Sequence, residues 1–548
     1  MTSSLVARAF SLLAAGTATV AFAQSGGAGS PTPRAGGQPA VRTLPLDPGL
    51  RPSSATYTPS GKVLVASEAQ GENGERQLTL HVMEDDGKNA RMIFSQVLPS
   101  RPKDNGLRYM VFADNKRVFL GDFVLECAPS LDTCSKSAVL PVAYPAEIAD
   151  GDHIAHRWSE MIIAPDNRHI AWTTLLANFS ALVFTGELRR AGDGYVVAEP
   201  RIISTLDPFA KDPKHPDGVI PQPVRGGEVK QFVRGGTAIS LAGARRSDLA
   251  DSVVLDLATG RTEAITRTPG YDETTIFSPD ERHGMVMSTR FSPSTDLAIL
   301  GLVPRPYPDS LNMGLNMLAY TYGVTGVRRS RPGNVGPALT EISKSTSQDG
   351  YLGTNLALEP DWVFHSPMSW HPHSTKAAWI EGKRGTEERR VRIVTLEGAP
   401  KRAAVAVRRT PTAMPYAIRD LSVVKAYAAK SQDIDVKVHG RRSGYITYRR
   451  TPRGSIEKTY VNYSDDEGAV LSGRETTQVN PRGNSVYTAD LALTGAKHGI
   501  MKLKMTFGPI QGQNPAALIF APDASGRPQS HGFAEFGRTR LTVESLAP

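Results

Sequence analysis

The chain has 548 residues, of which 40% are hydrophobic and 21% are charged. This length exceeds one ordinary domain, and the apolar content is sufficient for packed cores, which excludes a mostly disordered protein. Lys and Arg number 63 against 54 Asp and Glu, giving a net charge of +9. No segment interleaves aromatic with basic residues, so we expect no nucleic-acid partner.

The N-terminus has the pattern of a signal peptide over residues 1–23. Arg8 supplies a positive charge, an apolar run follows from Ala9 to Phe22, and Ala21-Phe22-Ala23 is a cleavage site for export. The run is too short to remain as a membrane anchor, so we expect a secreted or periplasmic protein. Residues 24–45 begin with a segment rich in Gly, Ser, Pro and Gln and are predicted to be a flexible linker.

The two cysteines of the chain are Cys127 and Cys134. Pro129 and Asp132 lie between them, as they would in a turn. An exported protein meets an oxidising compartment, so we predict that the two cysteines form a local disulfide. Two ligands are too few for a zinc site, and no metal site is predicted from them.

A short element recurs between residues 46 and 425. It consists of apolar residues, a turn that contains Pro, Asp or Gly, and a β-rich segment, and its best copy is Phe277-Ser278-Pro279-Asp280 before Met285 to Met287. The turn positions are 59, 113, 165, 234, 279 and 372. Four-stranded repeats of roughly 40–50 residues are typical of β-propeller blades. The longest gap has room for an additional blade without the motif, so residues 46–425 predict an all-β propeller of six or seven blades.

The segment from Asp256-Leu257-Ala258-Thr259-Gly260 to Phe277-Ser278-Pro279-Asp280 resembles the repeat of TolB-like propellers. The resemblance implies that an aspartate and a turn end one blade, and that the Ser-Pro-Asp turn precedes the second strand of the next. Proline fixes φ in such a turn and the aspartate accepts backbone amides. The motif therefore predicts a scaffold and carries no information about chemistry.

Residues 426–548 differ in character from the repeats. Ile434, Val436 and Val438 alternate with polar residues, as does the later segment from Met501 to Phe507, which is typical of half-buried antiparallel strands. We predict a C-terminal β-sandwich-like domain. Ile418 to Ala429 is predicted to be a helix that packs between the two domains.

The innermost strand of each propeller blade lines the central channel, and residues just before each turn are expected at its mouth. The candidate catalytic residues are Glu273, Glu228, Glu160, Asp272, His156 and His153. The candidate substrate-binding residues are Arg108, Arg157, Trp158, Arg290 and His365. Several blades would thus bring carboxylates, histidines and arginines to one concave place, although polar channel residues often only bind water and close the ring.

The carboxylates of this set are paired by strand register. Neighbours on a strand point to opposite faces, so Asp272 and Glu273 cannot both face the channel. Glu273 shares its register with Glu228, whereas Glu160 is one position off and is expected to face its blade. Glycoside cleavage uses two carboxyls that flank the bond. Glu273 and Glu228 are therefore the predicted catalytic pair.

A second resemblance covers Phe277 to Arg282, Thr289 to Pro293 and Ile299 to Pro306, which look like secreted propellers grouped with fungal saponin hydrolases. It implies cleavage of a glucuronide or related sugar from a glycoside. Arg290 would then hold a substrate carboxylate.

Two functions remain open from the sequence. The first is a secreted carbohydrate-active enzyme that cleaves a glycosidic bond of a glycoside or a uronic-acid-containing sugar. The second is a non-catalytic periplasmic propeller that binds a protein or a glycan. No cofactor is predicted, and a divalent metal bound by His153, His156 and His365 stays an open alternative.

Overall fold

The structure is a computed structural model. It describes residues 39–70, 75–99, 108–149, 154–155, 160–176, 178, 180–223, 225–244, 249–292, 297–305, 322, 335–430, 433–451, 455–465, 468–480, 483–509 and 517–547. The predicted signal peptide and most of the predicted linker lie outside these residues. Within them, no helix is long and apolar enough to cross a membrane.

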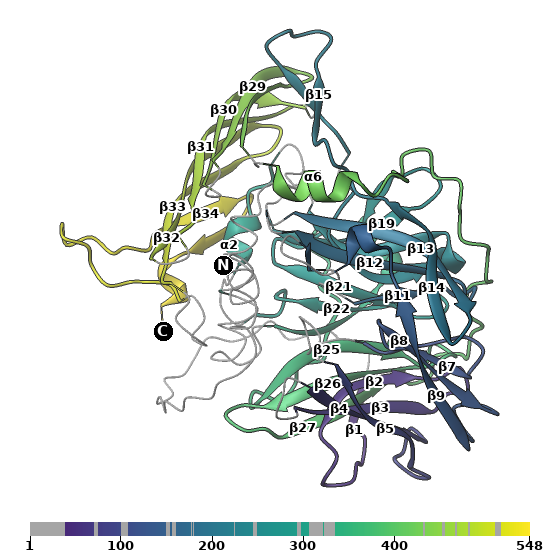
Figure 1. The fold of residues 1–548 in the computed structure, drawn as a ribbon. Coiled ribbons are helices and arrows are strands. Elements are labelled where there is room, and N and C mark those ends of the chain that lie inside the picture. Colours follow the sequence, from purple (N-terminus) through teal and green to yellow (C-terminus); the bar gives the residue numbers. More distant parts are fainter. Residues whose placement is uncertain are drawn as a thin grey trace.

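Six antiparallel groups of four strands succeed one another along the described chain and form a β-propeller (Figure 1). The first group contains β2 (Pro52–Tyr57), β3 (Val63–Gln70), β4 (Glu75–Met83) and β5 (Arg91–Pro99). The second contains β6 (Met110–Val111), β7 (Arg117–Phe119), β8 (Phe123–Ala128) and β9 (Lys136–Ala143). The third contains β11 (Ile162–Ile163), β12 (His169–Leu176), β13 (Ala181–Ala191) and β14 (Gly194–Ile202). The fourth contains β17 (Glu228–Val233), β18 (Ala238–Ala244), β19 (Ala250–Asp256) and β20 (Thr262–Ala264). The fifth contains β21 (Asp272–Phe277), β22 (His283–Ser288), β23 (Gly336–Glu341) and β24 (Thr354–Asn355). The sixth contains β25 (Trp362–Trp370), β26 (Lys376–Lys383), β27 (Arg389–Thr395) and β1 (Ala40–Thr43).

The second and third groups are additionally joined at their outer edges. β9 and β14 pair in parallel, with Tyr195 opposite Val142, and the short β10 (Ile154–Ala155) extends the third group by pairing with β12. This pairing removes two exposed edges that would otherwise be free to pair with another chain.

The sixth group is completed by the N-terminal strand β1, which pairs with β27 with Ala40 opposite Thr395. The prediction of a linker over residues 24–45 is therefore wrong at residues 40–43. The composition of the segment before them concealed a strand whose backbone covers the edge of β27. Because β1 and β27 come from opposite ends of the repeat region, their pairing joins these two ends in one group.

All six predicted turns lie between the first and second strand of a group. In the best copy, the Ser278 amide donates to the His283 carbonyl over 2.9 Å, and the Ser278 hydroxyl donates to Asp280 over 2.6 Å. The long gap before residue 372 holds an insertion, because β22 and β23 are direct neighbours although residues 289–335 separate them. Of these residues, the described ones contain the short helix α2 (Ala298–Gly301) and no strand.

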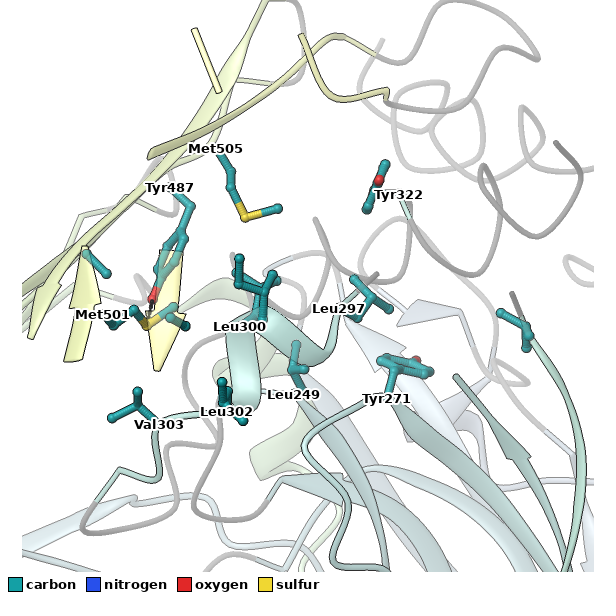
Figure 2. Close-up of a cluster of buried hydrophobic side chains, with 14 of the residues drawn as sticks. Leu249, Tyr271, Leu297, Leu300, Leu302, Val303, Tyr322, Tyr487, Met501 and Met505 are labelled. Carbon is teal, nitrogen blue, oxygen red and sulfur yellow. Dashed lines mark hydrogen bonds between the residues drawn. The ribbon is translucent and has the colours of Figure 1, made fainter. Parts of the chain in front are cut away.

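The described residues 433–547 form one eight-stranded antiparallel sheet in simple chain order. Its strands are β28 (Ile434–His439), β29 (Ser443–Arg450), β30 (Ile456–Ser464), β31 (Ala469–Gln478), β32 (Ser485–Gly495), β33 (Gly499–Phe507), β34 (His531–Phe536) and β35 (Thr539–Thr542). The predicted sandwich of two sheets is not what these residues form. The alternation that suggested it is real, but the apolar face packs on α2 and its neighbours (Figure 2). Leu300 and Val303 there belong to one cluster with Tyr487, Met501 and Met505.

A buried charge network fastens the insertion to this sheet. The Arg305 guanidinium lies 2.9 Å from Glu475 on β31, and the Lys458 ammonium lies 3.1 Å from the same carboxylate. Tyr460 and Tyr487 donate their hydroxyls to Glu475 as well. Burial by itself raises the pKa of Glu475, but the two cations and these bonds lower it well below its usual range.

A second insertion reaches the other end of the sheet. The hairpin of β15 (Phe209–Lys211) and β16 (Val219–Pro221) projects from the propeller toward β28 and β29 (Figure 1). Its Asp217 lies 2.8 Å from Lys437 and 3.1 Å from His439 of β28. Two insertions from different parts of the propeller therefore hold the C-terminal sheet.

The helix between the two units is shorter than predicted. α6 spans Val423–Ala429, whereas residues 418–422 are not helical. Its buried residues Val424 and Ala428 belong to a cluster with Trp172 and Ile202 of the propeller. The helix therefore packs on the propeller surface. It does so because its buried stripe consists of Val424 and Ala428, which cover the surface of one neighbour.

Candidate functional site

The first strands of the groups bring a compact set of charged side chains together in the middle of the propeller. Arg108 precedes β6, Glu160 precedes β11, Glu228 and Lys230 lie on β17, and Glu273 lies on β21. Four different groups contribute to them, and Arg108 also bonds to the backbone of a fifth. We call these five residues the channel cluster.

Lys230 is the centre of the channel cluster. Its ammonium lies 2.8 Å from the Glu228 carboxylate and 3.2 Å from the Glu273 carboxylate. Burial alone would lower the pKa of Lys230, but the neighbouring carboxylates of Glu228, Glu273 and Glu160 offset this and raise it. The lysine is therefore charged in the folded protein.

Arg108 spans the middle of the propeller. Its guanidinium donates to the carbonyl of Met368 on β25 over 3.3 Å and to the carbonyl of Lys230, and it lies 3.5 Å from Glu160. Burial lowers the pKa of Arg108, and the charge of Glu160 opposes that shift. The side chain is buried, and the hydrogen bonds and the ion pair named here are all made with other groups of the protein.

Glu228 and Glu273 both contact the ammonium of Lys230, in agreement with their shared register. Glu160 differs from the prediction, because it also lies in the channel cluster rather than facing its blade. It comes just before the two-residue strand β11, so the strand alternation that was used for it does not extend to its position. Asp272 points elsewhere, as predicted for the neighbour of Glu273.

Asp272 and Arg290 form an ion pair of 3.0 Å in which both side chains are fully buried. Arg290 also donates to Ser288 and to the carbonyls of Tyr351 and Leu352. The proposed role of Arg290 as a clamp for a substrate carboxylate therefore disagrees with the structure, which gives it an internal carboxylate. The segment after β22 folds back on β21, and this brings the pair together.

Of the other candidates, only His365 is described. It lies on β25 opposite Ile380, and its ring lies over the Cα of Gly382 on the neighbouring strand. His153, His156, Arg157 and Trp158 lie outside the described residues, so their placement remains a prediction. The described residues contain no group of three or more His, Cys, Asp or Glu side chains that could hold a metal ion.

The residue that sequence reasoning missed is Lys230. A signal for it was present, because Lys230 lies only two positions after Glu228 on one strand, although the register of β17 shifts between Val229 and Gln231. A lysine between Val229 and Gln231 in a strand that is otherwise half apolar is a polar residue at a core position. Such a lysine is rarely buried without a paired carboxylate.

The predicted disulfide is present between Cys127 and Cys134, with their Cα atoms 5.3 Å apart. It closes the connection between β8 and β9, and both residues belong to a hydrophobic cluster with Leu80 and Leu131. The bond therefore lies at the periphery of its group and takes no part in the channel cluster.

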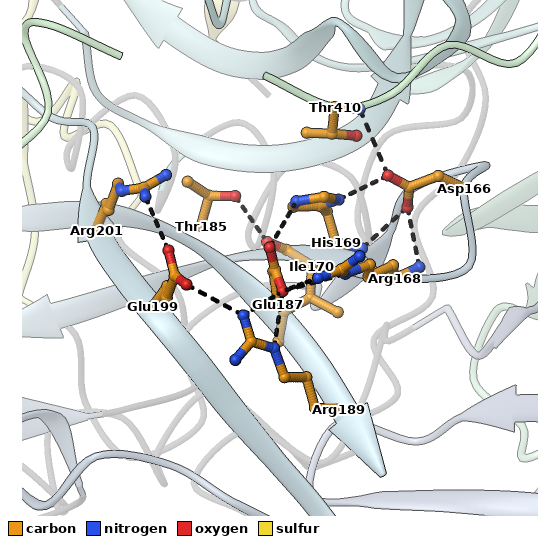
Figure 3. A network of polar contacts seen from close by, with 10 residues as sticks. All are labelled: Asp166, Arg168, His169, Ile170, Thr185, Glu187, Arg189, Glu199, Arg201 and Thr410. Atoms are coloured by element: carbon orange, nitrogen blue, oxygen red, sulfur yellow. Dashed lines mark hydrogen bonds and ion pairs between the residues drawn. The ribbon is translucent and has the colours of Figure 1, made fainter. Parts of the chain in front are cut away.

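A second polar network lies on the third group of strands (Figure 3). His169 Nδ1 lies 2.6 Å from Asp166, and Arg168 lies 2.7 Å from Glu187. The Thr410 amide donates to Asp166 over 3.5 Å. Burial raises the pKa of Asp166, but the bonds from His169 and from backbone amides outweigh it and lower the pKa well below its usual range. The network fastens the segment after β27 to a turn of the propeller.

Comparisons with known proteins bear on the fold. No family model matches the chain, and no curated protein matches it. The putative TolB from Agrobacterium tumefaciens is similar in structure, with a TM-score of 0.33 and 11% identity over 60% of this chain and 88% of that one. The chain is similar to this TolB in fold, and its assignment as a β-propeller rests on the strand groups described above.

Two further solved structures are similar to the chain. TolB from Acinetobacter baumannii has a TM-score of 0.31 and 11% identity, covering 63% of each chain. Prolyl oligopeptidase B from Galerina marginata has a TM-score of 0.29 and 7% identity, covering 74% of this chain and 46% of that one. The resemblance to saponin hydrolases stays a prediction.

Proposed function

We propose that the protein is an exported, non-catalytic propeller that binds a protein or a glycan at the mouth of its channel. The observation that supports this is the position of Lys230, whose ammonium bridges Glu228 and Glu273. A general acid needs a carboxyl whose proton is retained near neutral pH, which burial or a neighbouring like charge provides. A cation in contact favours the ionised carboxylate instead.

The proposal includes three finer points. The six groups of strands are the six blades of the complete ring, closed by β1 and β27. Residues 46–425, together with β1, are the propeller, and residues 426–548 are the C-terminal domain. The signal-peptide pattern of residues 1–23 and the disulfide favour the periplasm or the exterior of the cell.

The charge of the channel cluster indicates the chemistry of its ligand. Its five described residues comprise three carboxylates and two cations. Glu228 and Glu273 are the more exposed members, with side-chain exposures of 20% and 14%. Carboxylates are hydrogen-bond acceptors, so hydroxyl or ammonium groups of a ligand fit this place better than an acidic sugar does.

Cleavage of a glycoside is the second candidate function. It is favoured by one observation, which is that Glu228 and Glu273 reach the same ammonium and so lie on the same side of the channel. Two carboxylates in contact with one ammonium are near enough to each other for the separation that glycoside hydrolysis uses. In that case a substrate would have to displace Lys230 from one of them.

The two candidates are separated by measuring turnover and binding on a panel of glycosides and uronic-acid polysaccharides. We expect no turnover by the purified protein. Turnover that is lost in Glu273→Gln but kept in Glu457→Gln, a carboxylate on the C-terminal sheet, would overturn the non-catalytic proposal. Binding to a panel member or to a co-exported protein, weakened at least about tenfold by Glu273→Gln, would support it.

A further inference from the structure

A cavity of about 430 Å³ lies at the seam between the propeller and the C-terminal sheet, and none of the five residues of the channel cluster is among the described residues that line it. Its propeller side is the loop Thr268–Gly270 together with Thr289, and its opposite side is Leu541 of β35 and Ser545. The other described residues that line it are Arg290, Ser292, Ala298 of α2 and the exposed Leu352. Its volume is in the range of small-molecule sites, which occur preferentially at such domain boundaries.

The wall of this seam cavity is electrically balanced. Arg290 contributes to it, but the guanidinium is paired with Asp272 behind the wall, and both side chains are fully buried. Among the described residues that line it, no second cation or carboxylate occurs. Moving a charged ligand into such a place costs free energy that no opposite charge would recover, so the fitting ligand is uncharged.

Hydroxyl groups of the wall have unused hydrogen-bonding capacity of both kinds. Thr268 donates its proton to Asp272 over 2.7 Å, which leaves its oxygen as an acceptor. Thr289 accepts the Tyr271 amide over 2.8 Å, which leaves its proton to donate. The Oδ1 atom of Asp272, directly behind Thr268, is buried without a hydrogen-bond partner. A ligand with several hydroxyl groups can both donate and accept here.

Part of the described wall is apolar. Pro269, Ala298, Leu352 and Leu541 present only carbon side chains to the cavity. A ligand that fits therefore needs hydroxyl groups on one part and a C–H surface on another, which is the surface of a neutral sugar ring.

We propose that the seam cavity binds a small uncharged polyhydroxylated ligand, of the class of neutral monosaccharides. This inference goes beyond the proposed function, because it adds a second site, for a sugar, to the one at the channel mouth, and either site can fail without the other. Because residues of β35 and propeller loops would contact one ligand, binding would also hold the C-terminal sheet to the propeller. Thermal stability should then rise with sugar concentration.

The test is binding by calorimetry and thermal melting with glucose, galactose and mannose, using glucuronate and glucosamine as charged counterparts. Ala298→Phe places a ring in the cavity, and Ala492→Phe adds the same ring to an exposed position of the C-terminal sheet. We expect at least one neutral sugar to raise the melting temperature of the wild type and of Ala492→Phe. Ala298→Phe should bind it at least tenfold more weakly, and the charged counterparts should not bind.

Leu352→Trp on the exposed rim of the cavity is the second blocking variant if Ala298→Phe does not fold. Binding of no neutral sugar by the wild type would overturn the inference and leave the protein-binding branch of the proposed function standing. Binding that survives both blocking variants but is lost in Glu273→Gln would place the sugar in the channel, which overturns the seam site alone. Turnover of glycosides would instead overturn the non-catalytic proposal.

Discussion

The amide of Val405 donates to the carbonyl of Pro279, in the best of the six predicted turns, over 2.8 Å. Two further amides, three residues before and after Val405, make the same kind of bond to the turns of neighbouring groups: Arg402 to His373 over 3.3 Å and Arg408 to Gly235 over 2.9 Å. Three residues per step is the period of a polyproline II helix. The segment 402–408 is thus a strap that advances one blade for every three residues.

Gly235 tests the strap. Its φ is +69°, and a Cβ there would overlap the carbonyl oxygen of Ala406 in the strap. Gly385 is the matched control, because its φ is +68° and a Cβ there would meet nothing within 4 Å. Gly385→Ala should cost about 1 kcal/mol from backbone strain alone. Gly235→Ala should cost at least about 2 kcal/mol more, because the strap must move.

Urea unfolding of the two glycine variants measures this difference. Proteolysis within residues 402–408 should also become faster in Gly235→Ala than in Gly385→Ala. Equal losses of stability and equal cleavage would mean that the strap contributes nothing at that turn.

Lys230→Met removes the cation of the channel cluster while keeping most of the side-chain volume. Three carboxylates then share a buried place with only Arg108, and breaking a buried pair in this way costs about 3–5 kcal/mol. We expect a loss of this size in urea unfolding at pH 7. Lys502→Met removes a cation that lies 3.8 Å from Asp490 on the exposed face of the C-terminal sheet, and should cost less than about 1 kcal/mol.

The pH dependence of Lys230→Met has a definite sign. In the wild type the pKa of Lys230 is raised by folding, so its contribution is complete below its unfolded pKa and is lost only when the pH rises through the folded one. In the variant, ionisation of the crowded carboxylates lowers the free energy of unfolding, and their protonation restores it. The stability deficit should therefore shrink as the pH falls from 7 toward 5, and a deficit independent of pH would contradict the cluster.

The repeat could be predicted from the sequence because it depends on local turn chemistry. Ser278-Pro279-Asp280 has the residues that its turn requires, and weaker copies such as Phe112 to Asn115 occupy the same place in their groups. The number of blades was left between six and seven because an insertion and a blade without a motif have the same effect on spacing. Pairing of β22 with β23 across the insertion is a long-range contact that no local pattern contains.

The candidate site was predictable only in part, for a similar reason. Spacing from the turn was enough to place Glu228 with Glu273, since both lie the same number of residues before the turn of their group, although β17 and β21 each contain a register shift. It failed for Glu160, which precedes its strand, and it could not show that Arg290 would be paired with Asp272. Ion pairs between segments that are distant in sequence depend on how the loops between strands fold back. The alternation of residues along a strand does not predict the path of those loops.

Replacing Cys127 and Cys134 together by serine removes a disulfide that closes a short loop at the edge of the second group. A loop this short constrains little of the unfolded chain, so the loss should be on the order of 1–3 kcal/mol, with the fold retained. Urea unfolding of the variant and of the wild type under reducing conditions should give the same midpoint. Two thiols titrating in the unreduced, unfolded wild type would show that the bond does not form.

His371 predicts how the protein responds to acid. It lies in the turn between β25 and β26, and its Nδ1 accepts the amide of His373 over 3.1 Å, so the ring is neutral in this arrangement. Burial, followed by the charges of His373 and Lys376, lowers the pKa of His371 to about 4. The unfolded chain takes up the proton first, at an ordinary pKa of about 6.5, so stability should fall as the pH drops from about 6.5 to 4 and stay level above that window.

His371→Asn keeps an acceptor for the His373 amide but cannot titrate, whereas His498→Asn changes an exposed histidine of the C-terminal sheet. The slope of unfolding free energy against pH in this window should decrease in His371→Asn and be unchanged in His498→Asn. If both variants keep the slope of the wild type, the acid sensitivity of the fold has another source.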